Sequence, residues 1–361
     1  DESEPGTFKD RDLLLRTPWL ILEGMILGGL VVGADKGYVY IRHEYHEQIE
    51  AVKDAIEHAR AMGACGPSIF GSQRSFDLEV FVSPGGYICG EQTALIEAME
   101  DHRAEPRNRP PQLQTNGLWD KPTLLNNVET FAWVPIIRLR ERGKWFAEAG
   151  KEGFLGRRFF SISVDVNRPG AYEVPNGITL RELIEDLAGG VRHGRPLKAV
   201  AASGPSGGFL PAKLPVSALR QGFVAKLPLG TTHFDLLDWQ LDIGLSREMG
   251  LMLGAGIVIY ADDVDMVDQA WACSRFYRDE SCGKCVPCRL GSTKLTELVT
   301  RIKARECATQ EIAAAKVLVN ELAQTMALTS ICGLGQVAAA PLRTLLEYFP
   351  EEVEARGQTP S

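Results

Sequence analysis

The sequence predicts a multidomain chain in which an α/β domain, an α+β module and an all-α domain follow one another. Strand-like and helical runs alternate through residues 1–156, which favours an α/β domain. Residues 157–262 contain alternating strands around one short helix, the pattern of a small α+β module. Residues 263–361 carry apolar residues at helical spacing with short links, which predicts a four-helix bundle.

In the α/β domain, apolar periodicity and the turn residues at its boundaries define the expected elements. Helices are expected at 18–29, 45–62 and 93–99, and strands at 37–42 and 76–82. Residues 106–122 hold four of the twenty prolines and show little periodicity. We therefore expect them to form a loop that crosses the surface or lines a site.

The same reasoning places the elements of the two later domains. In the α+β module, strands are expected at 158–166, 171–174, 200–204 and 256–260, with a short helix at 180–187. The bundle helices are expected at 264–278, 290–304, 310–328 and 337–348. Cysteine-containing links separate the first two and the last two of these helices, so both links are expected at one end of the bundle.

Composition and charge exclude several classes of protein. The 361 residues are 45% apolar and 24% charged, as in ordinary globular proteins. A net charge of -8 argues against nucleic-acid binding, which favours a basic face. The most apolar stretch, 19–34, is interrupted by Glu23 and falls short of the ~20 residues that span a bilayer. We expect it to be a buried helix and expect no direct membrane insertion.

Four of the eight cysteines form the strongest chemical signal in the chain. Cys282, Cys285 and Cys288 follow a C-x2-C-x2-C spacing, and Cys332 comes later in a Ser-Ile-Cys-Gly sequence. Three thiolates on one tight loop and one remote thiolate suit a [4Fe-4S] cluster, which takes one cysteine per iron. A tetrahedral zinc site could use the same four sulfurs, although such sites more often pair two C-x2-C knuckles. The spacing favours the cluster and leaves zinc and coincidence open.

The remaining four cysteines have no partner spacing, and we expect them to be small buried hydrophobic residues in a reducing compartment. They are Cys65, Cys89, Cys273 and Cys307.

Three further segments are weak signals when each is taken alone. The glycine-rich sequence 83–93 lies between a predicted strand and helix, and is either an ordinary turn or a loop that lets a ligand approach the backbone. It lacks the G-x-G-x-x-G spacing of a dinucleotide fingerprint. The pair Asn126–Asn127 before a helix suits an N-cap. The acidic segment 1–6 is by default a solvated turn.

Together these segments resemble one known family, the NADH-binding flavoprotein subunit of respiratory complex I and the related diaphorase subunits of NAD-linked formate dehydrogenases and hydrogenases. The resemblance rests on four motifs in one order: DESEPGTFKDR at 1–11, YICGE at 87–91, KPTLLNNVET at 121–130 and ESCGKCVPCR at 280–289. It implies a Rossmann-like FMN domain, a ubiquitin-like (SLBB-type) module and a four-helix bundle that holds a [4Fe-4S] cluster.

The resemblance also implies an activity. A hydride passes from NADH to FMN without a general acid or base, and electrons then pass singly to the cluster and onward to quinone through partner subunits. The chain is thus expected to be the electron-input subunit of an NADH dehydrogenase. A diaphorase subunit of a formate dehydrogenase or hydrogenase shares every motif. A non-catalytic interaction subunit that carries a cluster or zinc is the remaining alternative.

Carried over position by position, the resemblance implies three sets of site residues. The FMN set is Asp1, Glu2, Gly90, Glu91, Asn126, Asn127 and Thr130. The set for the nicotinamide and the rest of NADH is Glu4, Tyr87, Glu91, Gln92 and Arg109. The cluster ligands are Cys282, Cys285, Cys288 and Cys332.

Partners and location follow from the family alone. The resemblance implies a thioredoxin-like [2Fe-2S] subunit and a larger iron–sulfur subunit in the same complex. It also implies a cytoplasmic location, peripheral at the cytoplasmic face of the membrane through those partners.

The sequence departs from the family in two respects. The family's glycine-rich loop, upstream of the first motif, is not in this sequence, so we expect the domain to be incomplete at its N-terminus and the chain as given to bind FMN weakly. Gln92 replaces a glutamate that would repel a 2'-phosphate, and Gln112 replaces an aromatic residue that would stack on adenine. With Arg109 nearby, we expect weaker discrimination against NADPH, although Glu4 still favours NADH.

Overall fold

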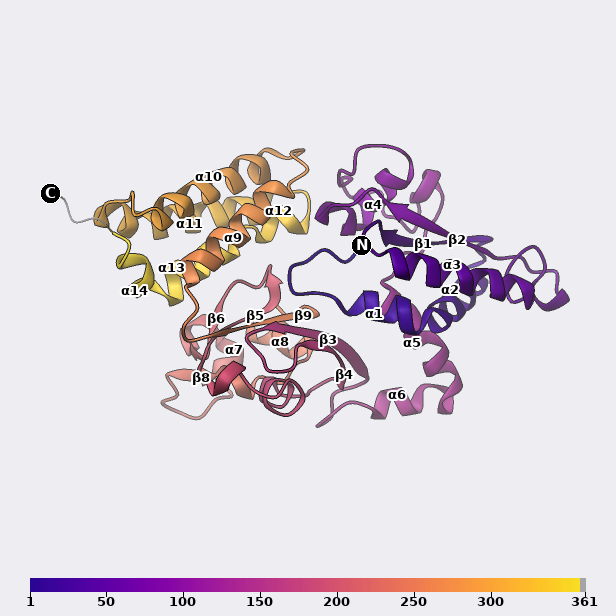
Figure 1. Cartoon of the computed structure of the whole chain (residues 1–361), viewed down its shortest axis with the longest axis horizontal. Helices are drawn as coiled ribbons and strands as arrows, with labels where there is room; N and C mark the ends of the chain where they lie inside the picture. The colour runs from indigo at the N-terminus through magenta and orange to yellow at the C-terminus, as the bar shows by residue number, and fades with distance from the viewer. Residues whose placement is uncertain (358–361) are drawn as a thin grey trace. The chain divides into compact units, whose positions relative to one another are not determined.

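The computed structural model describes residues 1–357, and these fall into two compact units (Figure 1). The first unit contains residues 1–3 and 8–159. The second contains residues 4–7 and the chain from residue 160 onward. The predicted three-domain division at residues 156 and 262 is finer than these two units and stays a prediction.

The first unit has the strand–helix–strand order that the sequence predicted. Its two strands are parallel and pair in register over their full length, with the helix α3 between them in the chain. The strands are β1 (Lys36–Arg42) and β2 (Asp77–Ser83). The helices are α1 (Lys9–Arg16), α2 (Pro18–Val32), α3 (His46–Ala61), α4 (Gln92–Met99), α5 (Val128–Leu139) and α6 (Lys144–Glu148).

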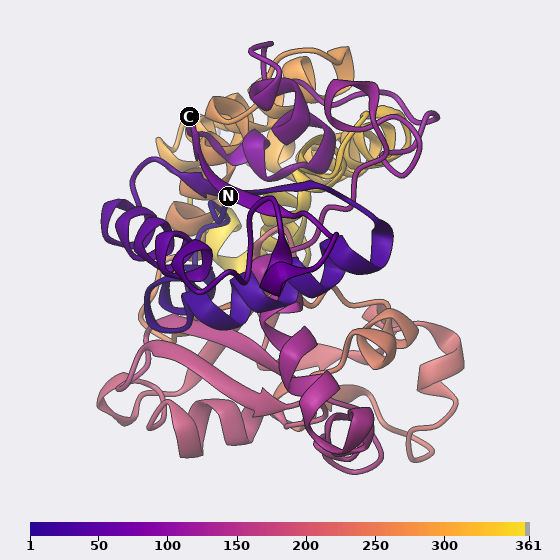
Figure 2. The ribbon, with the colours of Figure 1, turned by 90° about the vertical axis from the view of Figure 1, so that its right-hand side faces the viewer.

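Helix α2, near the indigo end of the colour scale in Figure 2, packs closely on its neighbours. Glycines on its surface allow this close approach. A Cβ on Gly24 would lie 1.9 Å from the carbonyl oxygen of Phe131 in α5, and a Cβ on Gly29 would lie 2.4 Å from the ring of Phe76. Ile21 and Leu22 are fully buried there. The expected helix is therefore present, and one face of it is buried as predicted, whereas Trp19, Val31 and Val32 are exposed.

No single helix among residues 1–357 is long and apolar enough to cross a membrane. Helices α1 and α2 satisfy the length and hydropathy criteria only as a pair, across a 90° bend.

The second unit is built on a five-stranded mixed sheet in the order β4-β3-β9-β5-β6. Strand β9 lies at its centre, parallel to β3 and antiparallel to β5, and all of its residues are buried. The strands are β3 (Arg157–Val164), β4 (Gly170–Pro175), β5 (Leu197–Pro205), β6 (Leu210–Pro211) and β9 (Gly256–Ala261). A separate hairpin pairs β7 (Lys213–Pro215) with β8 (His233–Asp235).

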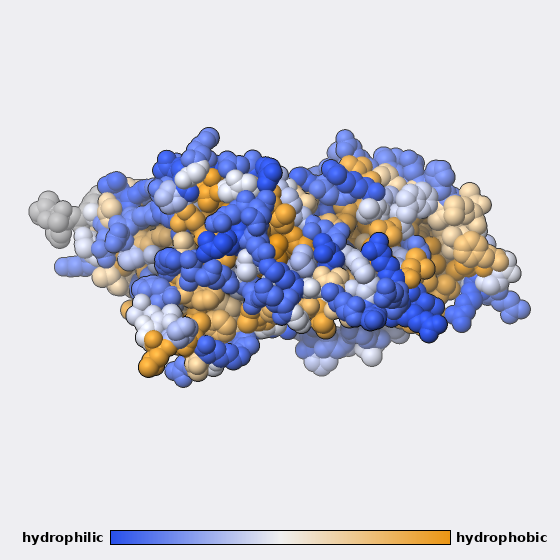
Figure 3. Space-filling view, turned by 90° about the horizontal axis from the view of Figure 1, so that it is seen from below, coloured by the Kyte–Doolittle hydropathy of each residue, from blue (hydrophilic) through white to orange (hydrophobic). Residues whose placement is uncertain are grey.

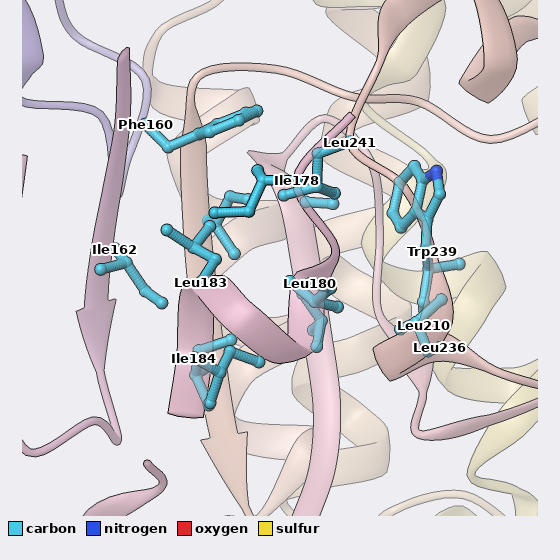
Figure 4. Close-up of a cluster of buried hydrophobic side chains, with 14 of the residues drawn as sticks. Phe160, Ile162, Ile178, Leu180, Leu183, Ile184, Leu210, Leu236, Trp239 and Leu241 are labelled. Carbon is cyan, nitrogen blue, oxygen red and sulfur yellow. The ribbon is translucent and has the colours of Figure 1, made fainter. Parts of the chain in front are cut away.

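One face of this sheet carries the core of the module. Figure 4 shows Phe160 and Ile162 of β3 facing Leu183 and Ile184, which come from the helical turn Glu182–Leu187. All four are at most 1% exposed. The predicted short helix at 180–187 is thus present, as a π-helical turn that turns its apolar side chains toward the strands. Two short helices, α7 (Gln221–Val224) and α8 (Ile243–Met249), complete the module.

The remainder of the second unit is helical, as predicted, with two differences. Its helices are α9 (Met266–Asp279), α10 (Val286–Lys303), α11 (Thr309–Thr329), α12 (Gly333–Val337), α13 (Ala340–Tyr348) and α14 (Pro350–Glu354). The helix expected at 337–348 corresponds to α13, and the short helices α12 and α14 before and after it were not predicted. Helix α10 begins before the expected residue 290, because Pro287 is tolerated in a first helical turn where no N–H bond is lost.

The cysteines agree with the expectation of a reduced chain. No disulfide forms among residues 1–357. Cys65, Cys89 and Cys307 are at most 3% exposed, as expected, whereas Cys273 is only partly buried.

On the face drawn in Figure 3, polar residues are interspersed with smaller groups of apolar ones, which is common on globular proteins.

The core of the module gives a stability prediction. Leu183→Ala removes a fully buried side chain and leaves a cavity, so it should lower the free energy of unfolding by about 2–5 kcal/mol. Leu229→Ala, at a fully exposed leucine of the same unit, should change it by less than about 0.5 kcal/mol. Urea unfolding monitored by circular dichroism measures both. Equal losses in the two variants would contradict this assignment of the core.

Candidate functional site

The first unit brings the motif at residues 1–3 against the glycine-rich segment that follows β2. The Asp1 carboxylate accepts hydrogen bonds from Ser3 Oγ at 2.6 Å and from Ser83 Oγ at 2.8 Å. The backbone oxygen of Asp1 lies 3.1 Å from the position that a Cβ on Gly90 would take, and no other atom comes within 4 Å of that position. Gly90 therefore borders open space on its remaining sides. Two segments that the sequence treated as separate motifs thus lie side by side.

Glu2 is buried and caps helix α1. Its Oε1 accepts a hydrogen bond from the Asp10 backbone N–H at 2.9 Å, and its Oε2 accepts from the Arg11 N–H at 3.3 Å and from the Tyr45 hydroxyl at 3.1 Å. Burial, reinforced by repulsion from Asp10, raises the pKa of Glu2 above its ordinary value. Both carboxylate oxygens thus satisfy N–H groups that a helix start leaves unpaired.

A buried lysine joins α1 to the start of α5. Lys9 Nζ lies 2.5 Å from Asp10 Oδ1, 2.8 Å from Glu129 Oε2 and 3.2 Å from Asn127 Oδ1. The Asn127 side chain in turn donates to Asp10 Oδ2 at 2.7 Å. Burial opposes the charge on Lys9, but Asp10 and Glu129 hold its pKa above the ordinary value overall. The family motifs at 1–11 and 121–130 therefore meet in one polar network.

Lys9, Asp10 and Glu129 were not predicted to be site residues from the sequence, although all three lie inside the quoted motifs. The available signal was a charged run, Lys-Asp-Arg, at the start of a predicted apolar region. Such a run is usually solvated, and only the structure shows that Lys9 is 6% exposed.

Helices α1, α4 and α5 of the first unit differ in the side chain that caps the N-terminus. Glu2 caps α1, and Glu91 caps α4 by accepting from the backbone N–H groups of Thr93 and Ala94 at 2.8 and 2.9 Å. The cap of α5 is a neutral group, Asn127, which accepts from the Glu129 N–H at 3.0 Å. A carboxylate on a helix N-terminus repels an incoming phosphate, and a neutral amide does not. Among these three, α5 is the helix start that suits an anionic ligand.

Asn126 and Thr130 flank this helix start and are exposed. The structure therefore leaves both residues accessible beside Asn127, as an FMN phosphate would require. The side chain of Asn127 is engaged within the protein by Lys9, Asp10 and the Glu129 N–H.

Three of the residues expected to face NADH, Glu91, Gln92 and Arg109, contact one another in the first unit. Arg109 Nη2 donates to Glu91 Oε1 at 2.9 Å and lies 3.5 Å from Gln92 Oε1. Tyr87 opens the short helical turn Tyr87–Gly90, directly after Gly85 and Gly86, whose φ angles are positive. These angles suit glycine and allow the sharp approach of the chain to this turn.

Glu4 belongs to the second unit. Its Oε1 accepts from the Ser206 backbone N–H at 3.1 Å and from Ser206 Oγ at 2.7 Å, and the same hydroxyl lies 2.9 Å from the Tyr277 hydroxyl in α9. The predicted role of Glu4 toward NADH stays a prediction.

The second unit brings the four motif cysteines together. Cys282 lies in the link after α9, Cys285 is the N-cap of α10, Cys288 lies in the first turn of α10 and Cys332 is the N-cap of α12. The pKa of the Cys288 thiol is raised to about 11, chiefly by burial and also by the charges of Cys285, Cys332 and Cys282, although a hydrogen bond with Ser281 opposes the rise. The mutual effect of the four thiols indicates that they share one small region.

The spacing of these sulfurs discriminates between the two metal centres left open by the sequence. A single zinc ion with Zn–S bonds of about 2.3 Å would draw its tetrahedral sulfurs to roughly 4 Å from one another. Among residues 1–357, no three of these sulfurs lie within 4.8 Å of one another. A cubane cluster needs more widely spaced thiolates, because each binds a different iron. The four sulfurs therefore lack the compact arrangement of a closed zinc site.

Among the described residues, the one group of three potential metal ligands whose ligand atoms lie within 4.8 Å of one another is Glu97, Glu100 and His102. Arg107 forms ion pairs with both glutamates of this group. The charge of these carboxylates is thus already balanced by a guanidinium, which argues against a cation there.

Comparison with known families agrees with both sites. Residues 1–136 match the family described as the Nuo51 FMN-binding domain. Residues 268–356 match the NADH-ubiquinone oxidoreductase-F iron-sulfur binding region, and residues 165–210 match the SLBB domain. The three matches follow the order of the predicted domains.

Individual relatives span nearly the whole chain. The F subunit of the NADH-quinone oxidoreductase of Aquifex aeolicus (strain VF5) is 39% identical over 357 residues, covering 98% of this chain and 76% of the relative. The HndC subunit of the NADP-reducing hydrogenase of Solidesulfovibrio fructosivorans is 37% identical over 360 residues, covering 98% of this chain and 67% of the relative.

A solved structure shows the same fold. A chain of the NAD+-reducing [NiFe]-hydrogenase in its H2-reduced state superposes with a TM-score of 0.81 at 33% identity, over 99% of this chain. This chain spans about half the length of that hydrogenase chain, 55%.

The buried lysine network gives a second stability prediction. Lys9→Met leaves Asp10 and Glu129 without their cation, so it should lower the free energy of unfolding by about 3–5 kcal/mol. Lys36→Met breaks an exposed pair with Glu79 in the same unit and should cost less than about 1 kcal/mol. Urea unfolding at pH 7 measures both losses.

The pH dependence of the Lys9 contribution has a definite sign. Because its folded-state pKa is raised, its stabilisation is fully present below the ordinary lysine pKa and is lost as the pH rises through the folded-state value. The difference between wild type and Lys9→Met should therefore narrow only at strongly alkaline pH. A difference that narrows near neutrality would contradict a charged buried Lys9.

Proposed function

The chain belongs to the family of Nuo51-type flavoproteins, the F subunits of NADH-quinone oxidoreductases, and from this membership we propose that it is the electron-input subunit of an NADH dehydrogenase. Its cofactors are FMN and a [4Fe-4S] cluster, and its substrate is NADH. When bound, FMN supplies hydride acceptance from NADH and single-electron donation to the cluster. The observation that carries the proposal is the convergence of four cysteines from two distant motifs in one small region.

The residues of the first unit bind and orient the flavin. The neutral N-terminus of α5, with Asn126, Asn127 and Thr130, holds the FMN phosphate. Gly90 leaves room for the flavin ring, because a side chain there would enter the open space beside Asp1. Glu2 acts by holding α1 in place, since both of its oxygens are already engaged.

NADH binding is assigned to a second set of residues. Tyr87 lines the nicotinamide pocket, and Glu91 lies beside both flavin and nicotinamide. Arg109, held by Glu91, and Gln92 face the adenosine ribose. Glu4 supplies a further carboxylate toward the nucleotide. No acid–base residue is needed, because hydride transfer moves no separate proton.

Electrons leave through Cys282, Cys285, Cys288 and Cys332, which ligate the cluster. The relatives are named as subunits, so partner subunits are expected here as well. We assign a thioredoxin-like [2Fe-2S] subunit and a larger iron–sulfur subunit as those partners, with quinone as the onward acceptor. Both partners would place the chain at the cytoplasmic face of the membrane.

A specific observation favours a second candidate, the diaphorase subunit of a hydrogenase. HndC is a hydrogenase subunit, and the superposed structure is an NAD+-reducing hydrogenase. Both functions use the same FMN, NADH and cluster chemistry in this chain. They differ in the partner subunits, so co-purification of the native complex distinguishes them. A non-catalytic cluster or zinc subunit is the third and weakest candidate.

The proposal is tested on the full-length protein, purified without oxygen. We expect FMN after acid extraction, about four irons per chain and a visible spectrum that bleaches on addition of NADH. Zinc in place of iron, or iron and flavin that NADH does not reduce, would contradict it.

Cys332→Ser tests the remote ligand in the same assay, and it should remove most of the bound iron. Cys307→Ser is the matched control, because Cys307 is also a cysteine of the bundle region, fully buried but outside the motif. It should retain wild-type iron. Equal iron contents in the two variants would remove Cys332 from the ligand set.

The contacts of Arg109 predict relaxed dinucleotide selectivity. Gln92→Glu adds a carboxylate beside Arg109, at the residue assigned to the adenosine ribose, and it should repel the 2'-phosphate of NADPH. We expect the ratio of kcat/KM for NADH to that for NADPH to rise on the order of tenfold, which is about 1.4 kcal/mol. Steady-state oxidation of both dinucleotides with an artificial acceptor measures this ratio.

Gln73→Glu is the control for added charge. Gln73 is exposed in the same unit and also precedes a basic residue, Arg74, but no dinucleotide role is assigned to it. Its ratio should stay at the wild-type value. An unchanged ratio in Gln92→Glu, or an equal rise in both variants, would rule out Gln92 as the selectivity residue.

A further inference from the structure

We infer that Ser330 donates a hydrogen bond to a sulfur of the bound [4Fe-4S] cluster and thereby raises its reduction potential. This inference rests on the proposed function, because it requires the cluster on Cys282, Cys285, Cys288 and Cys332. It concerns a residue outside the ligand set, which we assign as a positioning and tuning residue.

The first observation is a buried hydroxyl whose hydrogen bond is missing. Ser330 is 7% exposed, and its Oγ makes no hydrogen bond within the described part of the chain. Leaving a buried hydroxyl unpaired costs about 1–3 kcal/mol, so such a group usually has an acceptor. The acceptor of the Ser330 hydroxyl is therefore expected to be a group that binds to the protein.

The second observation places this hydroxyl at the cluster cysteines. A Cβ on Gly335 would lie 2.5 Å from Ser330 Oγ and 2.8 Å from the Cβ of Cys288. The serine hydroxyl and the ligand cysteine thus pack against the same point of α12. Gly335 is buried and has no side chain, which lets these two groups meet.

The third observation is that the backbone holds Ser330 in place on both sides. Its N–H donates to the Met326 carbonyl at 3.0 Å, and its carbonyl accepts from Gln336 Nε2 at 3.2 Å. The hydroxyl rotor is the remaining polar group of the residue that can adapt to a bound sulfur. A fixed backbone keeps that donor beside the cluster at little entropic cost.

A neighbouring serine shows what such a contact looks like when the acceptor belongs to the chain. Ser281 Oγ lies 3.2 Å from Cys288 Sγ. Ser281 is only partly buried, whereas Ser330 is nearly fully buried. Of the two hydroxyls, that of Ser330 is thus the more deeply buried, and a hydrogen bond is electrostatically stronger in such a low-dielectric place.

The effect of the Ser330 hydroxyl on the reduction potential of the cluster follows from the negative charge that reduction adds. Reduction adds one electron to the cluster, so its sulfurs become better hydrogen-bond acceptors, and a donor stabilises the reduced form more than the oxidised form. Removing the donor should shift the reduction equilibrium toward the oxidised form by on the order of tenfold, which is about 59 mV for a one-electron couple.

The test is an EPR-monitored redox titration of the full-length protein and of Ser330→Ala. We expect Ser330→Ala to keep wild-type iron content, to have a more negative midpoint potential, and to lose one exchangeable-deuteron coupling in pulsed EPR after transfer to D2O. The deuteron signal is a readout that a purely structural role would not change.

Ser274→Ala is the matched control. Ser274 Oγ is also buried without a hydrogen-bond partner in the described residues, but its carbonyl accepts from Thr296, two helical turns beyond Cys288 in α10. Its midpoint potential should equal that of wild type. An unchanged potential in Ser330→Ala, an equal shift in Ser274→Ala, or loss of iron from Ser330→Ala alone would overturn the tuning role.

The outcomes also separate this inference from the proposed function. A wild-type protein without a [4Fe-4S] EPR signal would overturn the proposed function and, with it, this inference. A wild-type cluster that NADH reduces, with the same potential in Ser330→Ala, would overturn this inference alone.

Discussion

The flavin-binding unit depends on one buried charge, the ammonium group of Lys9. This group holds α1 to the start of α5 through Asp10, Asn127 and Glu129. A buried cation is tolerated only when anions and hydrogen bonds surround it. Because Glu129 also accepts from the backbone N–H of Phe159 at 2.8 Å, the same network extends to the start of β3. The position of α5, and hence of its neutral N-terminus, follows from satisfying Lys9.

Carboxylates in this unit have structural roles that a motif alone does not reveal. Glu2 and Glu91 both lie in motifs associated with cofactor binding, yet each satisfies the N–H groups of a helix start. Each cap places a carboxylate at a helix N-terminus, where it opposes the approach of an anion. Of helices α1, α4 and α5, α5 is therefore the one whose N-terminus is not capped by a carboxylate and is open to a phosphate group. Structural capping and ligand selection are thus two results of the same interactions.

Much of the fold could be predicted because it depends on local periodicity and on residues with a narrow range of conformations. The helices at His46–Ala61 and Thr309–Thr329 repeat apolar residues at helical spacing, and the strands at Lys36–Arg42 and Asp77–Ser83 alternate. The start of α10 was placed too late, since a Cys-Val-Pro-Cys sequence carries no apolar periodicity although Pro287 suits a first turn.

The residues of the candidate sites were less evenly predictable from the sequence than the fold was. The four motif cysteines were predicted as cluster ligands from their spacing and the family resemblance, because thiolates are rare and the geometry of a cluster is restrictive. The Lys9 network and Ser330 were not identified, because burial of an ordinary lysine or serine depends on contacts between segments far apart in the sequence. For Ser330 the missing information was its position beside Gly335 and Cys288. Only tertiary structure supplies that kind of information.

The two sites also differ in what holds them together. In the first unit, hydrogen bonds and ion pairs within the protein join Asp1 to Ser83, and Lys9 to Asp10, Asn127 and Glu129. The four cluster cysteines raise rather than relieve one another's electrostatic cost, as the pKa of Cys288 shows. Thiolates bind metal only when deprotonated, so a bound cluster removes this cost and links the ends of α9, α10 and α12. A bound cluster would therefore act as a structural element of the bundle as well as its electron carrier, and the proposed hydrogen bond from Ser330 would bear on both roles.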